Sequence, residues 1–130
     1  MISAVDFESV LYEHLKNDDT IISLVADRIF PIVIPQNTKL PCITFQRTSG
    51  VPANTLSGHS GLERIDMEID TWARNYAEAK DIAKAIRAAM PTNGPWAAHL
   101  SQDMDLYDSD TSYYRILSRY TVWFLENAID

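Results

Sequence analysis

Hydrophobic positions near the start of the chain repeat with the period of an α-helix, which predicts two helices before residue 26. The apolar face of the first consists of Phe7, Val10, Leu11 and Leu15. Ser3 or Asp6 can cap its start, and Asp18 or Asp19 can cap a shorter helix built on Ile21, Ile22, Leu24 and Val25. His14 shares the first apolar face, so we interpret it as a partly buried histidine held by a hydrogen bond.

The pattern then changes to short extended segments. Prolines at 31, 35 and 41 exclude a helix, and the clearest strand there is Cys42–Thr48, with Ile43 and Phe45 on one face. Gly50–Gly61 has little apolar content and predicts a long loop. Arg64–Thr71 alternates strictly, which predicts a strand covered on one side only. Its inward residues are Ile65, Met67, Ile69 and Thr71, and its outward residues are Arg64, Asp66, Glu68 and Asp70.

The strongest helix signal is NYAEAKDIAKAIRAAM, residues 75–90. Asn75 and Glu78 have capping-box spacing, and Pro91 ends the helix. Its predicted inward stripe is Tyr76, Ala79, Ala83, Ile86 and Met90. After the TNGP turn, residues 98–107 alternate again, with Ala98, Leu100, Gln102, Met104 and Leu106 on one side. His99, Ser101, Asp103, Asp105 and Tyr107 are expected on the other side.

A long final strand follows the reversal at DSDTS. Its inward residues are Tyr114, Ile116, Tyr120, Val122 and Phe124, and its outward residues are Arg115, Leu117, Arg119, Thr121 and Trp123. Together these elements predict an α+β fold, an antiparallel sheet of about four strands with helices packed on one face. The length of 130 residues suits one domain, spanning 1–130.

Composition narrows the function. The net charge of −7 argues against a protein that binds nucleic acid through its phosphates. It also argues against binding to an anionic membrane surface. The single cysteine, Cys42, forms no internal disulfide and is interpreted as a small core or edge residue. The acidic start lacks the features of a secretion signal, and no apolar run has the length of a membrane span. We therefore expect a soluble chain made in a cytoplasm.

The sequence contains residues that could suggest three kinds of chemistry: a hydrolase nucleophile, a calcium or zinc site, and a magnesium site. Ser57, His59 and Ser60 lie close in sequence but lack the nucleophile elbow of a hydrolase, and a flexible loop explains them better. The acids at 103–110 fail the calcium-loop pattern, and the three histidines lack zinc spacing. Asp66, Glu68 and Asp70 could hold Mg²⁺ on one strand face, which keeps a metal-dependent hydrolase or nuclease as an alternative. No catalytic residue, metal or cofactor is predicted.

The outward residues of the strands fit a contact surface better. Acids on this face oppose Arg47, Arg64, Arg115 and Arg119, which can pair across neighbouring strands. The same face carries Trp72, Leu117, Trp123 and Leu125, and large apolar groups on a wet face are typical of contact with another chain. The candidate contacts on this face are Trp72, Arg115, Leu117, Arg119 and Trp123.

The chain resembles the small tail-completion, or tail-terminator, proteins that join head and tail in long-tailed bacteriophages and prophages. The resemblance is strongest from Arg28 to Met90. The residues that carry it are Asp27, Arg28, Ile29, Pro31, Pro41, Ile43, Phe45, Leu56, Gly58, Gly61, Arg64, Ile69, Asp70, Trp72, Ala73, Tyr76, Glu78 and Ala79. It implies a structural virion protein that forms a ring, expected to be a hexamer, on the last ring of the tail tube. It implies no catalytic residues.

The same resemblance implies the partners: copies of the chain itself, the tail tube protein and the head connector or stopper. A head-side neck adaptor is a further alternative. The protein would be found in the host bacterial cytoplasm during assembly and then at the head-tail junction. We expect the loop to reach a neighbour or the tube through Asn54, Thr55, Leu56, Ser57, Gly58, His59 and Ser60. DNA would pass through the ring, and acidic side chains that line the channel would repel its phosphates. The candidate channel-facing acids are Asp66, Glu68, Asp70, Asp103 and Asp105.

Overall fold

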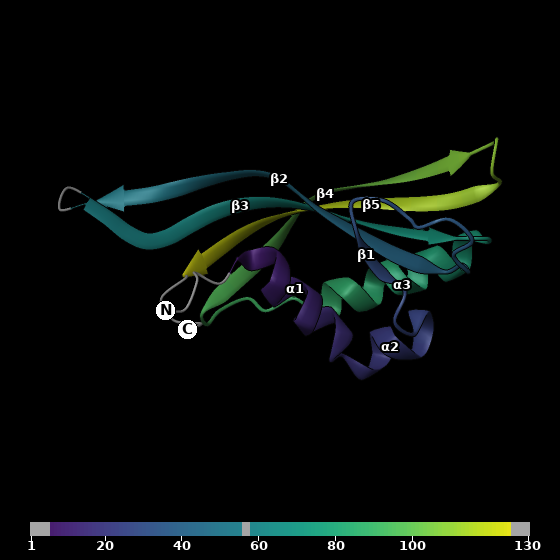
Figure 1. Ribbon diagram of the computed structural model, residues 1–130, viewed down its shortest axis with the longest axis horizontal. Helices are drawn as coiled ribbons and strands as arrows, with labels where there is room; N and C mark the ends of the chain where they lie inside the picture. Colours follow the sequence, from purple (N-terminus) through teal and green to yellow (C-terminus); the bar gives the residue numbers. More distant parts are fainter. Residues whose placement is uncertain (1–5, 56–57, 126–130) are drawn as a thin grey trace.

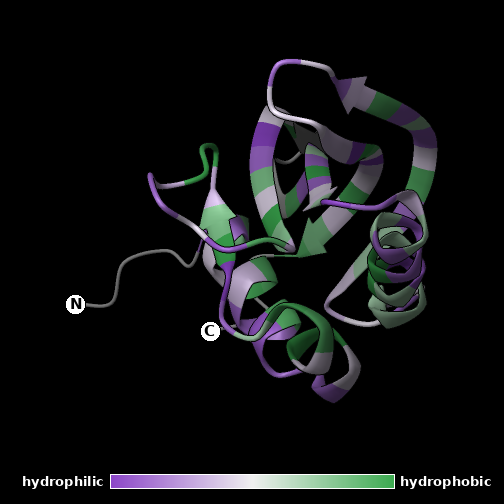
Figure 2. Ribbon diagram, turned by 90° about the vertical axis from the view of Figure 1, so that its right-hand side faces the viewer, coloured by the Kyte–Doolittle hydropathy of each residue, from purple (hydrophilic) through white to green (hydrophobic). Residues whose placement is uncertain are grey.

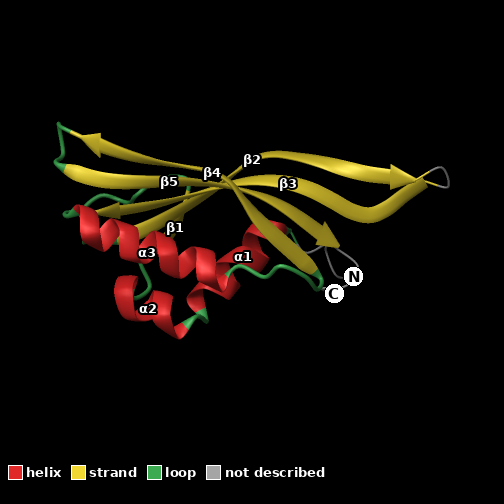
Figure 3. Ribbon diagram, turned by 180° about the vertical axis from the view of Figure 1, so that it is seen from behind, coloured by secondary structure: helices red, strands yellow, loops and turns green. Residues whose placement is uncertain are grey.

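Helices cover one face of a twisted sheet and leave the other face bare (Figures 1 and 3). The structure, a computed structural model, describes residues 6–55 and 58–125, with side chains described except at 52–61. The strand order is β1-β2-β3-β5-β4, and every neighbouring pair is antiparallel except β1 with β2. The predicted α+β class with an antiparallel sheet and helices on one face is confirmed, with one extra parallel strand at the edge.

The strands differ greatly in length. The edge strand β1 covers only Ile29–Pro31, whereas its neighbours β2 (Cys42–Thr55) and β3 (Gly58–Ala73) form a long hairpin. The second hairpin consists of β4 (Trp96–Asp108) and β5 (Tyr113–Leu125), and β5 pairs with β3 in the middle of the sheet. In Figure 1 the end of the β2–β3 hairpin projects beyond the helices, so no helix lies beneath it.

Each helix begins where a short polar side chain caps its first turn, as the sequence predicts. In α1 (Phe7–Lys16), Asp6 accepts a 3.0 Å hydrogen bond from the Ser9 amide. In α2 (Asp19–Val25), Asp18 accepts one from Ile21 at 3.0 Å. In α3 (Tyr76–Ala89), Asn75 accepts one from Glu78 at 2.7 Å. Such caps satisfy amides that have no partner inside the helix, and each contributes about 1 kcal/mol.

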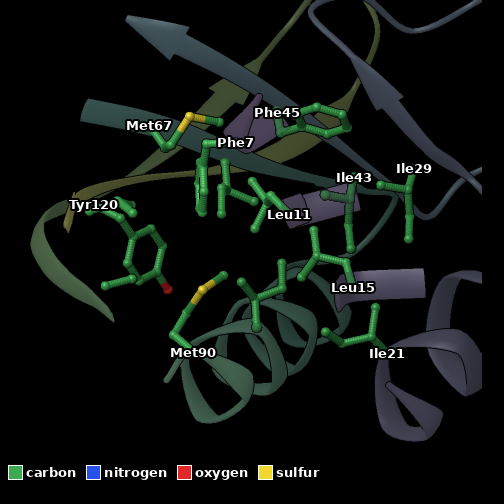
Figure 4. Close-up of a cluster of buried hydrophobic side chains, with 14 of the residues drawn as sticks. Phe7, Leu11, Leu15, Ile21, Ile29, Ile43, Phe45, Met67, Met90 and Tyr120 are labelled. Atoms are coloured by element: carbon green, nitrogen blue, oxygen red, sulfur yellow. The ribbon is translucent and has the colours of Figure 1, made fainter. Parts of the chain in front are cut away.

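The core lies between the helices and the covered face of the sheet (Figure 4). Phe7 lies at its centre, 5.0 Å from Trp96 and 5.4 Å from Phe124 between ring centroids. Its fully buried side chains also include Leu11, Leu15, Ile21, Ile43, Ile65, Met67, Ile69, Ile82 and Ile86. The hydropathy colours of Figure 2 alternate along the strands, as expected for a sheet with one covered face. The periodicity predicts most of the buried positions of the first helix, of Arg64–Thr71 and of the last strand, but Asp70 and Leu117 are also buried although both were predicted to face outward.

One inward residue of the third helix was predicted wrongly. Tyr76 is 45% exposed, while Ile82, which the predicted stripe omits, is fully buried. Tyr76 is the first helical residue, so its ring lies at the helix end and packs beside Tyr114 instead of entering the core.

The predicted loop Gly50–Gly61 is wrong as a conformation. Apart from residues 56–57, which lie outside the described part, it consists of the paired ends of β2 and β3. A register shift between Arg47 and Ser49 and another between Ala53 and Asn54 bend this ribbon. Backbone pairing with β3 and bulges thus accommodate a segment whose side chains have little strand character.

A bulge also changes the second half of β4. The partners of β5 shift between Leu100 and Gln102, so Ser101 is the extra residue. Ala98 and Leu100 face the core, but beyond the bulge Asp103 aligns with Ser118 and Asp105 with Ile116, on the helix side. The prediction that Asp103 and Asp105 share a face with Asp66, Glu68 and Asp70 is therefore wrong, because one inserted residue reverses the alternation.

Candidate functional site

The uncovered face of the sheet carries a compact polar cluster centred on Asp70. Arg115 donates to Asp70 Oδ2 from Nε at 3.1 Å and from a terminal nitrogen at 2.7 Å, and it also reaches Glu68 Oε2 at 3.2 Å. Arg119 Nε lies 3.9 Å from Glu68 Oε1. The expected pairing of acids and arginines across neighbouring strands is therefore present between β3 and β5.

Asp70 is only 4% exposed, although it lies on the face that no helix covers. Its Oδ1 atom is buried and has no hydrogen-bond partner in the described part of the chain. Burial, and secondarily the neighbouring Glu68 carboxyl, raise the pKa of Asp70 to about 7, although Arg115 acts in the opposite direction. An ionised carboxylate with one unsolvated oxygen is unfavourable, which is the physical reason for the direction of this shift.

Trp72 lies beside this cluster and contacts Thr44 and Arg115. Its Nε1 donates to Thr44 Oγ1 at 3.0 Å, and the Arg115 guanidinium lies 4.8 Å from its ring centroid, in cation–π geometry. Leu117 is on the same face but only 7% exposed. Trp72, Arg115 and Leu117, expected to offer surface to a partner, are thus engaged mainly with their own chain.

Larger apolar groups stay exposed nearer to the projecting end of the hairpin. Trp123 is 40% exposed and Leu125 is 38% exposed, both on the uncovered face of β5. Val51 on β2 is 56% exposed and aligns with Arg64, which aligns with Trp123. These three residues form what we call the apolar patch. Of the predicted contacts, Trp123 belongs to it, and Arg119 is half exposed beside the Asp70 cluster.

The five candidate acids separate into two groups. Asp66, Glu68 and Asp70 lie on the uncovered face of β3, where only Asp66 keeps a well exposed carboxylate, with a side chain 38% exposed against 14% for Glu68. Asp103 and Asp105 lie on the helix side instead.

Asp105 links β4 to α3. It accepts hydrogen bonds from the Tyr76 hydroxyl at 2.5 Å and from Lys80 Nζ at 3.3 Å. The hydrogen bond from Tyr76 is the main reason why the pKa of Asp105 is lowered. The sequence gives no hint of this link, because it depends on the bulge at Ser101.

The candidate contact segment Asn54–Ser60 ends the long hairpin. Asn54 aligns with His59 and Thr55 with Gly58, while Leu56 and Ser57 lie outside the described residues. We call residues 51–55 and 58–64 the arm, since the end of the β2–β3 hairpin projects beyond the helix layer (Figure 1). Nothing is described of the side chains of 52–61, so the contact role of this segment stays a prediction.

Two residues with potentially reactive side chains, Cys42 and His14, pack within the fold. Cys42 is fully buried, and desolvation raises the pKa of its thiol to about 11, which is unfavourable for a nucleophile. His14 Nε2 forms a 2.7 Å hydrogen bond with the Ala89 carbonyl oxygen, and its ring meets the edge of Trp96. This confirms the prediction of a histidine held by a hydrogen bond.

In residues 6–55 and 58–125, no three His, Cys, Asp or Glu side chains are grouped so as to hold a metal ion. Among the helices described, none has the length and apolar character to cross a membrane.

Two comparisons with known proteins found a match, one with a family model and one with a solved structure. The model of the family "Tail completion protein gp17" matches residues 9–125. A chain from the solved structure of the virion of a native gene transfer agent particle has a similar fold, with a TM-score of 0.73 at 16% identity. That match covers 87% of this chain and 90% of the other. A search of curated proteins found no match.

Proposed function

Because the chain belongs to the family of tail completion protein gp17, a family of structural phage proteins, we propose that it caps a tail tube as a ring of identical copies. The match over residues 9–125 is the observation that carries this proposal, since it spans nearly all the described chain. The ring, expected to contain six copies, ends growth of the tube and joins it to the head connector or stopper. The protein acts without catalysis.

The arm is the part best suited to reach a partner. The described pairing of β3 with β5 reaches Leu62, opposite Leu125, and the pairs described nearer the tip join β2 and β3. A two-stranded ribbon is marginally stable alone, so docking on a neighbouring copy or on the tube would stabilise it. The apolar patch of Val51, Trp123 and Leu125 lies at its base and offers surface that water solvates poorly.

The uncovered face of the sheet is proposed to line the channel through which DNA passes. The three acids of β3 on this face are each paired with an arginine: Arg64 lies 3.7 Å from Asp66, and Arg115 contacts Glu68 and Asp70. Paired charges leave little net attraction for phosphate, so DNA would pass without specific binding. The protein would be made in the host cytoplasm and retained at the head-tail junction.

Electron microscopy of the purified chain mixed with tail tubes of its own particle tests the proposal. Tubes capped at one end are the expected result. Binding to head connectors but not to tubes would instead support a head-side adaptor. Failure to bind either would refute a joining function.

A shortened arm tests which part docks. Residues 52–63 are replaced by Asn-Gly, a two-residue turn that joins the aligned positions Val51 and Arg64. We expect this variant to keep a cooperative thermal transition, because its helices and core are unchanged, but to cap tubes at least tenfold less often. Normal capping by the folded variant would contradict the role of the arm.

A further inference from the structure

An apolar groove with an acidic rim lies at one edge of the molecule, between α1 and the strands β1 and β2. Its volume is about 450 Å³, and Tyr12, Pro31 and Phe45 supply its apolar surface. Its charged lining residues are all acids, namely Asp6, Glu8 and Glu13. We call this surface the acidic groove.

A basic surface lies toward the opposite edge, where side chains of α3 reach β4, as in the pairing of Lys80 with Asp105. Lys80, Lys84 and Arg87 follow each other at intervals of four and three residues, so they form one stripe along the helix. They line a cleft of about 140 Å³ in which Asp103 is the only acid among the lining residues. Lys80 already pairs with Asp105, whereas Lys84 and Arg87 are exposed. We call this stripe the basic ridge.

These two surfaces lie on opposite edges of one sheet, because β1 and β4 end the strand order. A closed ring needs two different surfaces, one on each side of every copy. Resting on the ring proposed above, we propose that the acidic groove of one copy receives the basic ridge of the next copy. Since the chain carries a net charge of −7, copies repel each other on average, and a local cluster of cations decides which faces can meet.

The directions of the edge strands are also compatible with side-by-side contact between neighbouring copies in a ring. β2 and β4 run antiparallel to each other, because three antiparallel pairings separate them. In a ring of copies related by rotation, β4 of one copy therefore runs antiparallel to β2 of its neighbour. β1 covers only Ile43–Phe45 of the outer edge of β2, and in the described strands the rest of that edge is unpaired. Unpaired edges are ready templates for another strand.

Both the acidic groove and the basic ridge have exposed apolar side chains close to their charged residues. Tyr76 is 45% exposed at the start of the ridge helix, and Tyr107 is 54% exposed on β4. Both rings adjoin Tyr114, at centroid distances of 6.1 and 4.9 Å. These exposed rings supply the apolar counterpart for the surface of the acidic groove formed by Tyr12, Pro31 and Phe45.

Charge reversal with rescue tests the proposal, using Glu13→Lys in the groove and Lys84→Glu on the ridge. Both positions are exposed, so both variants should fold, and thermal melting checks this. Asp81→Lys is the matched control, because Asp81 is exposed on α3 but lines neither surface. Capped tubes are counted by electron microscopy, and rings are detected by cross-linking of the full chain.

Each single reversal should reduce ring formation and capping at least tenfold, because like charges then meet at every contact. The chain carrying both reversals should recover, and so should an equal mixture of the two single variants. In the mixture, alternating copies pair a reversed groove with a reversed ridge, and a native groove with a native ridge. Asp81→Lys should assemble as the native chain does.

The possible failures are distinguishable. If both single variants assemble like the native chain, or if neither the double variant nor the mixture recovers, the proposed surfaces are wrong while the ring itself stands. If the native chain forms no ring with tubes or on cross-linking, both the proposed ring and the proposed contact between groove and ridge are wrong.

Discussion

Replacing Asp70 by asparagine should change how the stability of the protein depends on pH. In the folded chain, burial raises the pKa of this carboxyl from 3.8 to about 7. The folded state therefore holds the proton at pH values where the unfolded chain has lost it. This contribution to stability is complete below about pH 4 and is lost as the pH rises through 7.

The size of the effect follows from the shift. One pKa unit corresponds to about 1.4 kcal/mol, so a shift of roughly three units sets an upper bound of about 4 kcal/mol. Asparagine has nearly the same shape and no charge, so the variant lacks this term. We therefore compare the free energies of unfolding of the native chain and of Asp70→Asn. The advantage of the native chain should fall by up to about 1.4 kcal/mol per pH unit between pH 4.5 and 7.

Urea unfolding followed by tryptophan fluorescence, repeated from pH 4.5 to 7.5, measures this difference. Asp66→Asn is the control, since Asp66 lies on the same face of the same strand with an exposed carboxylate. Its difference from the native chain should vary less with pH. Equal slopes for the native chain and Asp70→Asn would refute the reasoning. A native chain that gains stability over the variant as pH rises would show that the ion pair with Arg115 outweighs burial.

Four further results are expected. Deleting Ile69 from β3, which pairs with β5 without a register shift, should destabilise the fold by more than about 3 kcal/mol in urea unfolding, because part of the strand must then face the wrong way. Deleting Ser101 should have less effect, because the residues after it keep their faces and their β5 partners once the extra residue is gone. Phe7→Ala should lower the free energy of unfolding by about 3–5 kcal/mol, since it empties the centre of the core. Asn75→Ala should cost about 1 kcal/mol by the same assay, and Asn75→Asp should restore most of it. At pH 8 a thiol reagent should leave Cys42 unmodified in the folded chain and modify it fully in denaturant, because the thiol is buried and protonated.

Local chemistry accounts for the elements that the sequence predicts well. The cap at Asn75 and the alternation of Arg64–Thr71 act over a few residues, so both can be read without knowing the rest of the fold. The three-residue strand Ile29–Pro31 has no such signal, because only its parallel pairing with β2 makes it a strand. Pairing likewise extends β2 to Thr55, through a segment whose composition predicts a loop.

The candidate site was harder to predict for the same reason. The Asp70–Arg115 pairing follows from two neighbouring strands and was anticipated as charge matching across the sheet. The burial of Asp70 was not, since it depends on how side chains pack on the face that no helix covers, where Arg115 contacts both Asp70 and the Trp72 ring. The positions of Asp103 and Asp105 depend on one unpaired residue, which leaves no mark in the hydrophobic pattern.

The link between Asp105 and α3 makes the two ends of the sheet mechanically unequal. At the β4–β5 turn, the sheet is fastened to the helix layer by the Tyr76 hydroxyl and the Lys80 ammonium. At the other end, the arm extends past the helices (Figure 1), and the hydrogen bonds and ion pairs described there lie within the sheet. A load applied to the arm would therefore bend the ribbon before it disturbed the helices, whereas a load on the β4–β5 turn would be carried directly into α3.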